Sequence, residues 1–257
     1  MQTVTSPFPV AYPPARTGSA YLLPFHIHFC LVAEGAIFLD LRRDKYLALD
    51  AVQTSALGTL AANWPVDRVL DVSKQSGCDT VGTEIGDALV EAGLLTRGPT
   101  EGRSLSPETS VPAREELWPF DTRGRSPVNL SGLRRYLKAY VRVSLSLRFG
   151  TLERLAHRVA VRKARALERH GKLQVAKIKE LLGVYQVLQA FTFTAKRACL
   201  FDSLLLIDFL AQYGLYPDWV VGVRTGPFAS HSWVQQDVYI LNGTKQYVQG
   251  FTPILVV

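Results

Sequence analysis

Residues 199–213 are apolar on nearly every side, and this segment does most to limit what the chain can fold into. A helix with apolar residues all round must be buried among other elements. Gly214 follows at a position where a left-handed glycine can end the helix. The β-branched run 219–223 predicts a strand, Gly226-Pro227 breaks it, and residues 232–241 predict a second strand. We therefore expect a buried helix beside two strands.

Two reactive side chains stand at defined points of this pattern. Cys199 opens the helix, where the helix dipole and free N–H groups stabilise a thiolate, and His231 follows 32 residues later beside the second strand. A thiol and an imidazole so placed are typical of a cysteine nucleophile and its base. The alternative is an inert buried thiol. Lys196 and Arg197, just before the helix, argue against that alternative because they favour the thiolate.

The residues around this pair resemble those of a known family, the transglutaminase-like cysteine proteases that mature lasso peptides (the microcin-processing type). The likeness covers the C-terminal half and rests on Ala198-Cys199-Leu200, Val221-Gly222-Val223-Arg224-Thr225, Pro227-Phe228 and His231-Ser232-Trp233-Val234. It implies a papain-like fold and removal of a leader from a ribosomally made precursor. Cys199 would attack the scissile carbonyl, and His231 would protonate the leaving amine. A separate ATP-dependent, asparagine-synthetase-like lasso cyclase would then use the freed amine of the core peptide.

The third catalytic member departs from the family pattern. An ungapped match places the expected carboxylate at Gly243, which has no side chain. A tight turn at Gln236-Asp237 would pair His231 with Asn242 across a hairpin, and an Asn can orient a catalytic histidine. Asp237 is the alternative, although a solvated turn residue is its simpler interpretation. We therefore predict Asn242 as the third member.

The first hundred residues predict a separate module. Alternating patterns predict strands over 26–32, 36–41 and 45–49. Three helices are predicted to follow. The first begins near Val52 with Asp50 as its N-cap, the second lies near 66–74, and the third spans 82–93 and ends at Gly93. The stretch from Phe38 to Asp50 resembles the PqqD-like leader-recognition domain, also called the RiPP recognition element, a winged-helix variant. The resemblance implies that this module binds the leader.

An exposed strand edge can accept an extended peptide by β-augmentation. The predicted edge is the third strand, with the helix over 82–93 as the other wall. Tyr46, Leu47 and Leu49 are candidate leader contacts because they lie on that strand. Ordinary core and edge packing explains Leu47 and Leu49 at least as well.

Composition divides the chain into parts. The Pro-rich residues 1–19 predict a disordered start, 20–97 the PqqD-like domain, 98–129 a linker rich in Pro, Gly, Ser and charge, and 130–257 the transglutaminase-like cysteine protease domain. The fold class is α+β. Neither a secretion signal nor a run of 18 apolar residues is evident, and three cysteines without disulfide-like spacing fit a reducing cytoplasm.

Positive charge is concentrated in residues 121–200, which hold 18 Lys or Arg and 4 Asp or Glu. Apolar residues recur there at helical spacing: Leu133, Leu137, Tyr140, Val141, Leu145, Leu152, Leu155 and Val159. We expect helices that pack on the protease core and expose charged faces. A surface for an acidic partner, or for peripheral contact with an anionic membrane, is the alternative. Nucleic acid is not expected because no recognition motif accompanies the charge.

His26, His28 and Cys30 would share one strand face, as zinc ligands can. No second ligand cluster is evident, so we expect a half-buried strand face and no metal or other cofactor. Two other functions stay open. One is a transglutaminase-like acyltransferase that passes the acyl group from Cys199 to an amine. The other is a catalytically impaired peptide-binding module, for which Gly243 is the main argument.

Overall fold

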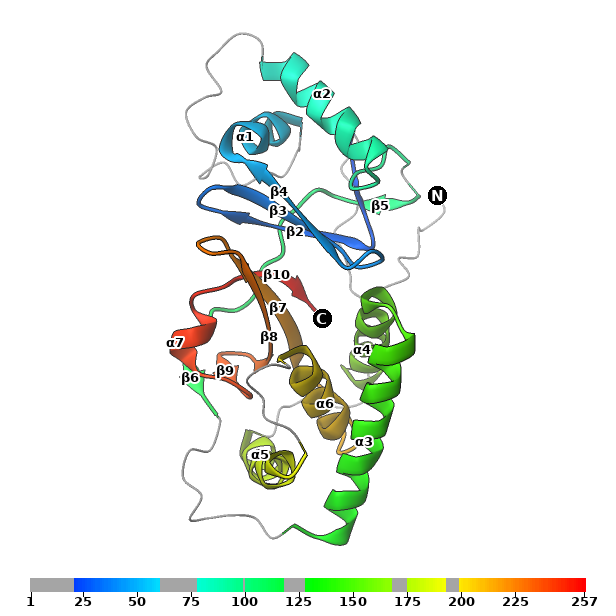
Figure 1. Cartoon of the computed structure of the whole chain (residues 1–257), viewed down its shortest axis with the longest axis vertical. Helices are drawn as coiled ribbons and strands as arrows, with labels where there is room; N and C mark the ends of the chain where they lie inside the picture. The colour runs from blue at the N-terminus through cyan, green and yellow to red at the C-terminus, as the bar shows by residue number, and fades with distance from the viewer. Residues whose placement is uncertain (1–20, 61–77, 99, 118–127, 168–174, 193–198) are drawn as a thin grey trace. The chain divides into compact units, whose positions relative to one another are not determined.

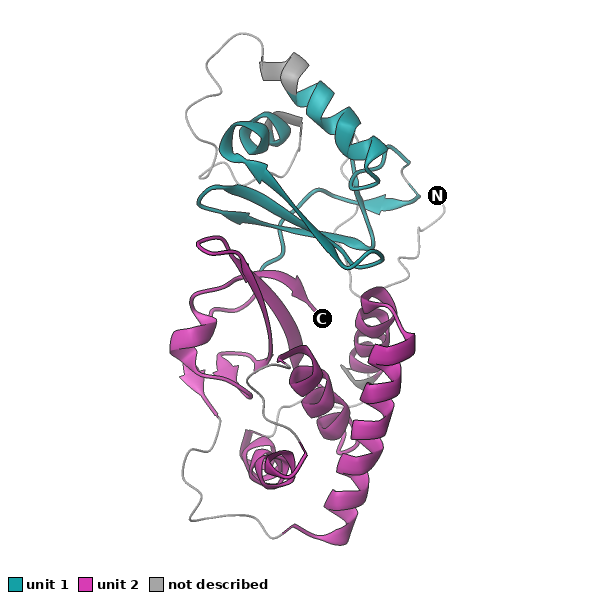
Figure 2. Cartoon of the chain, in the orientation of Figure 1, with its two compact units in different colours: residues 1–109 teal, residues 110–257 magenta. Residues whose placement is uncertain are grey.

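The computed structural model describes residues 21–60, 78–98, 100–117, 128–167, 175–192 and 199–257. The chain has a mixed α+β fold and divides into two compact units, Met1–Thr109 and Ser110–Val257 (Figure 2). The predicted disordered start and the predicted helix near 66–74 lie outside the described residues, as do Lys196 and Arg197.

Unit 1 contains an antiparallel sheet with the strand order β2-β3-β4. Its elements are β1 (Leu23–Pro24), β2 (Ile27–Val32), β3 (Gly35–Asp40), β4 (Lys45–Asp50), α1 (Ala51–Leu60), α2 (Cys78–Glu91) and β5 (Gly102–Arg103) (Figure 1). The strands expected from alternation are confirmed, and β1, which pairs with β5, was not predicted.

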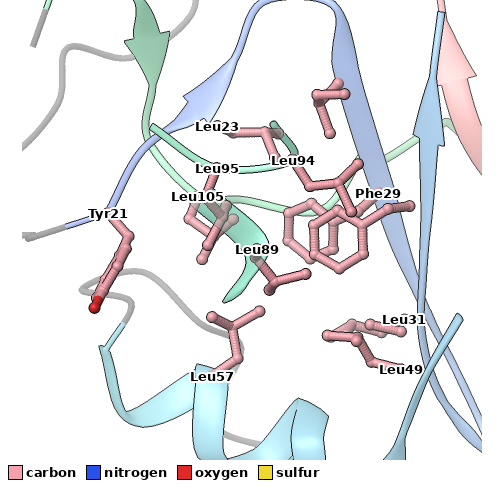
Figure 3. Packing of buried hydrophobic residues seen from close by; sticks show 13 residues of the cluster. Tyr21, Leu23, Phe29, Leu31, Leu49, Leu57, Leu89, Leu94, Leu95 and Leu105 are labelled. Atoms are coloured by element: carbon pink, nitrogen blue, oxygen red, sulfur yellow. The ribbon is translucent and has the colours of Figure 1, made fainter. Parts of the chain in front are cut away.

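Local signals explain where these elements begin and end. Asp50 caps α1 as predicted: its carboxylate accepts from the Gln53 N–H (2.8 Å), and the Gln53 side chain accepts from the Asp50 N–H (3.1 Å). Gly93 follows α2 with a φ of 75°, the left-handed conformation of a helix stop. One sheet face and the helices enclose an apolar core that includes Phe29 and Leu49 (Figure 3).

Residues 98–129 were predicted to form a linker, and this is wrong for many of those that the structure describes. β5 pairs with β1, Leu105 is buried in the unit 1 core, and Glu108 accepts from Arg103 (3.0 Å) and lies 2.8 Å from His28 Nδ1. Residues 102–108 therefore belong to the first unit. Further along, β6 (Glu115–Glu116) pairs in parallel with a strand of the second unit. The division falls between Thr109 and Ser110.

Unit 2 contains a five-stranded sheet with the order β10-β7-β8-β9-β6. Its strands are β7 (Asp218–Arg224), β8 (Ala229–Gln236), β9 (Tyr239–Ile240) and β10 (Thr252–Val256) besides β6. Its helices are α3 (Leu130–Phe149), α4 (Leu152–Leu167), α5 (Val175–Ala190), α6 (Cys199–Ala211) and α7 (Lys245–Val248) (Figure 1). The buried helix and the β7–β8 hairpin confirm the predicted pattern, and Gly214 has the expected left-handed φ of 76°.

Helix α6 is the buried helix that the sequence predicted, with Leu205, Leu206 and Phe209 fully buried. It packs against β8 and α3. In the second half of α6, the buried Asp208 forms ion pairs with Arg142 of α3 and Arg162 of α4. These pairs fix α6 to both basic helices, so two of the many cations of this region are structural.

The expectation that the apolar positions of 131–169 face the core is only partly correct. Leu155 and Val159 of α4 are buried, whereas Leu137, Val141 and Leu145 of α3 are exposed. The buried face of α3 consists of Gly132, Tyr136, Ala139 and Val143. The helix thus has two faces with apolar side chains, and only one of them is buried.

Candidate active site

Cys199 is the first residue of α6, and its side chain is partly exposed. Its position at a helix N-terminus gives the sulfur access to the free N–H groups and the positive end of the helix dipole. Residues 202–210 of the helix are buried, so the thiol stands at the end of a firmly packed element. A nucleophile held in this way needs little reorganisation before it attacks a substrate.

His231 lies on β8, directly opposite Gly222 on β7. Three aromatic rings surround the imidazole: Trp233 (6.0 Å between centroids), Tyr247 (4.8 Å) and Phe251 (5.3 Å). Gly222 makes this packing feasible, because a Cβ there would lie 2.8 Å from the Trp233 ring and 3.0 Å from Phe251 Cβ. Neither Tyr247 nor Phe251 was predicted to be near the site.

Burial lowers the pKa of His231 to about 4. The folded protein therefore holds a neutral imidazole at physiological pH, which is the form that accepts a proton from a thiol. Its Nε2 atom is buried and has no hydrogen-bond partner. This nitrogen is thus not engaged by another part of the described chain.

The structure packs the helix that begins at Cys199 against the strand that carries His231. No hydrogen bond joins the two side chains among the interactions of the described residues. Catalytic hydrogen bonds are often loose in the absence of substrate. The arrangement supplies a thiol on one element and a neutral imidazole on the adjoining element.

The predicted pairing of His231 with Asn242 is wrong. The β8–β9 turn lies at Asp237 and Val238, so Gln236 pairs with Tyr239 and Gln235 with Ile240. This register is shifted by two residues from the expected one. Asn242 Oδ1 instead accepts from the Val234 N–H (2.7 Å). Asn242 therefore holds the backbone of β8 three residues beyond His231 and does not lie opposite its ring.

Two other positions were considered for a third member, Asp237 and Gly243. Asp237 has a φ of 50°, a left-handed conformation that Asp tolerates, and it lies in the turn itself. At Gly243 an added Cβ would meet only Ile240 and Val248, each at 3.7 Å, which is ordinary contact. Space for a side chain therefore exists at Gly243.

A buried carboxylate that the sequence analysis missed lies one helical turn after Cys199. Asp202 is 5% exposed and accepts three side-chain hydrogen bonds, from Tyr185 (2.7 Å), Gln189 (2.5 Å) and Asn242 (2.8 Å). Burial raises the pKa of its carboxyl, and the three hydrogen bonds oppose that shift. The sequence signal for this group was its place as one of two acids, with Asp208, in a helix of mostly apolar residues.

Through Asn242, the Asp202 carboxylate connects the first turn of α6 to β8. The amide of Asn242 donates to Asp202 on α6 while its oxygen holds Val234 on β8. Tyr185 and Gln189 bring α5 into the same network. Asp202 thus positions the helix of Cys199 relative to the strand of His231.

Arg224 is a second residue that was not predicted as a site residue. Its guanidinium lies over the Phe251 ring, 5.2 Å from the centroid, and the same ring packs against His231. Its Nε atom is buried without a hydrogen-bond partner. The Phe251 ring is therefore in contact with both the Arg224 guanidinium and the His231 imidazole.

In unit 1, β4 is an edge strand of the β2-β3-β4 sheet. Its candidate leader contacts differ in exposure: Leu47 is 41% exposed, Tyr46 is half-buried, and Leu49 is 8% exposed within the core cluster. Leu49 is therefore a core residue, in agreement with the explanation by ordinary core packing. Of the three candidates, therefore, only Leu47 and Tyr46 present side-chain surface to solvent.

His28 and Cys30, which the sequence placed on one strand face, are buried in β2. His28 Nδ1 lies beside Glu108 and Arg103. In the part of the chain that the structure describes, no three His, Cys, Asp or Glu side chains are grouped as metal ligands.

Residues 139–256 match the model of the transglutaminase-like superfamily, so the C-terminal half contains a transglutaminase-like core domain. This match covers α6, the β7–β8 hairpin, Cys199 and His231. No curated protein and no solved structure matches the chain.

Proposed function

We propose that this chain is a cysteine peptidase that removes the leader from a lasso precursor peptide. The observation that carries the proposal is the placement of Cys199 at the start of a buried helix packed on the strand of a neutral His231, within a transglutaminase-like domain. This domain class supports cysteine-dependent acyl chemistry. The resemblance of residues 198–200, 221–225 and 231–234 to lasso-maturation proteases supports the finer assignment.

The proposed reaction transfers the leader's acyl group first to Cys199 and then to water. The neutral imidazole of His231 takes the Cys199 thiol proton, and the sulfur attacks the scissile carbonyl carbon. The C–N bond breaks as the imidazolium returns the proton to the leaving amine, which becomes the N-terminus of the core peptide. Water, deprotonated by His231, then attacks the thioester carbon. The C–S bond breaks, the imidazolium returns its proton to the Cys199 thiolate, and the leader leaves with a free carboxylate. The Arg224 guanidinium is available to hydrogen-bond a carbonyl of the peptide.

The product of the reaction tests this proposal directly. Incubating the purified chain with its precursor peptide should give two new masses: a leader ending in a carboxylate and a core with a free amine. In water containing ¹⁸O, one label should enter the leader carboxylate. A leader joined to an added amine would show acyl transfer, the function that a transglutaminase-like domain also supports. An intact precursor that nevertheless binds the chain would favour the impaired binding module.

Leader recognition is the second part of the proposal and is assigned to unit 1. The edge strand β4 offers backbone groups for β-augmentation, and Leu47 offers an exposed apolar side chain beside them. The released core amine would pass to an asparagine-synthetase-like lasso cyclase as the partner enzyme. The cytoplasm, where the precursor is made, is the proposed location.

We expect the Leu47→Ser variant of the full chain to bind a labelled leader peptide about tenfold more weakly, because an apolar side chain of this size contributes roughly 1.5 kcal/mol when buried. Val52→Ser is the matched control: Val52 is 61% exposed in the same unit but lies on α1. Fluorescence anisotropy gives both affinities. Equal weakening by the two variants would contradict recognition at β4.

A further inference from the structure

Helix α3 directs a row of large apolar side chains toward solvent. Leu137, Val141, Leu145 and Phe149 recur every four residues and are 47%, 55%, 52% and 71% exposed. Leu130, at the start of the helix, is 73% exposed. Residues four apart advance by only about 40° around a helix, so these side chains form one band along it. The core of unit 2 does not bury this band.

Exposed cations lie within the same band. Arg134, Lys138 and Arg148 are exposed, and at 3.6 residues per turn they fall between the apolar side chains. The sequence of α3 holds no Asp or Glu. We call Leu130, Arg134, Leu137, Lys138, Val141, Leu145, Arg148 and Phe149 the α3 outer face. This face carries both apolar side chains and positive charge, so a binding partner that matches it must offer apolar groups and negative charge.

The residue types of the α3 outer face distinguish between a protein and a lipid complement. Protein interfaces concentrate their binding energy in Trp, Tyr and Arg, and Leu and Val are under-represented there. Helices that lie on membranes combine Leu and Phe with Lys and Arg. The apolar members of the α3 outer face are three Leu, one Val and one Phe. This composition favours a lipid surface.

We propose that the α3 outer face lies on an anionic phospholipid surface. The aliphatic side chains would enter the boundary between headgroups and acyl chains, and the three cations would meet lipid phosphates. None of the helices in the described ranges is long and apolar enough to cross a bilayer. Because the exposed apolar side chains of α3 occupy one face only, the helix would lie in the plane of the interface. This binding is independent of the peptidase chemistry.

Flotation of the full chain with vesicles tests the proposal. The chain should bind vesicles of phosphatidylcholine containing phosphatidylglycerol, and bind those of phosphatidylcholine alone much more weakly. Replacing Arg134, Lys138 and Arg148 by Gln should weaken binding about 100-fold, because each cation near an anionic surface contributes about fivefold. Replacing Leu137, Val141 and Leu145 by Gln should weaken it at least as much, since apolar burial is lost.

The matched control is the triple variant Arg165→Gln, Lys177→Gln, Lys179→Gln. It removes the same charge from exposed positions on α4 and α5. Its binding should stay within about threefold of the unmodified chain, as expected for charges that lie off the docking face. An equal loss in the control would mean that only net charge matters, and would overturn the proposal.

Two other results would also overturn it. One is failure of the unmodified chain to bind phosphatidylglycerol vesicles, which would leave a protein partner as the occupant of this face. The other is a dimer, seen by sedimentation equilibrium, that the three-Gln apolar variant converts to monomer. Circular dichroism confirms that each variant is folded, and exposed substitutions of this kind usually change stability little.

Discussion

Cys199→Ala should lower the rate of leader release by roughly a thousandfold or more while leaving leader affinity within about twofold. The thiol takes part only in bond making, and the leader is assigned to another unit of the chain. Single-turnover cleavage followed by mass spectrometry measures the rate, and anisotropy measures the affinity. Substantial cleavage by the Ala variant would remove Cys199 from the mechanism.

Cys30 provides the matched control for this prediction. It is 1% exposed in β2, and burial raises the pKa of its thiol to about 12, so it holds no thiolate at neutral pH. Cys30→Ala should therefore leave the rate per folded molecule unchanged. Brief treatment with iodoacetamide should modify Cys199 and spare Cys30. Inactivation that follows modification of Cys30 instead would contradict the assignment.

Features that depend on short stretches of sequence could be predicted. The buried helix after Cys199, the left-handed Gly214 and the Asp50 cap of α1 all follow from neighbours within a few residues. Each rests on a local cause: apolar residues all round, the lack of a Cβ, and a carboxylate three residues before an N–H.

Features that depend on distant contacts could not be predicted. A composition rich in Pro, Gly and charge made residues 98–129 look like a linker. Nothing local shows that Arg103 and Glu108 contact His28, some 75 to 80 residues away. Helix α3 carries two apolar faces, and periodicity alone does not say which one meets the core. In the structure the face with Gly132, Tyr136, Ala139 and Val143 is the buried one.

The error at Asn242 has a physical cause of the same kind. A hairpin's register is fixed by its turn, and the turn here places Asp237 at a φ of 50°. Predicting the turn one residue too early shifted the partner of His231 by two residues. The Asn side chain was then free to bind Val234 and Asp202, a contact across 40 residues of sequence that spacing does not reveal.

Asp202→Ala should be the most destabilising single substitution in the candidate site. It removes the acceptor for buried donors on Tyr185, Gln189 and Asn242. Each buried donor left unsatisfied costs about 1–3 kcal/mol, so the free energy of unfolding should fall by roughly 3 kcal/mol or more. Urea denaturation measures the loss. A change below about 1 kcal/mol would mean that water or rearrangement satisfies these donors.

Loss of positioning can be separated from loss of stability with Asn242→Ala. It breaks the connection from Asp202 to β8 but leaves the Tyr185 and Gln189 bonds in place. At a temperature where the variant is folded, kcat should fall about tenfold or more with KM little changed, because the helix of Cys199 is less well aligned with His231. In a double-mutant cycle the Asp202 and Asn242 substitutions should be non-additive in kcat, since each removes the hydrogen bond that joins these two side chains. Additive effects would show that Asp202 contributes to folding alone, and that the alignment of thiol and imidazole depends on other contacts between α6 and β8.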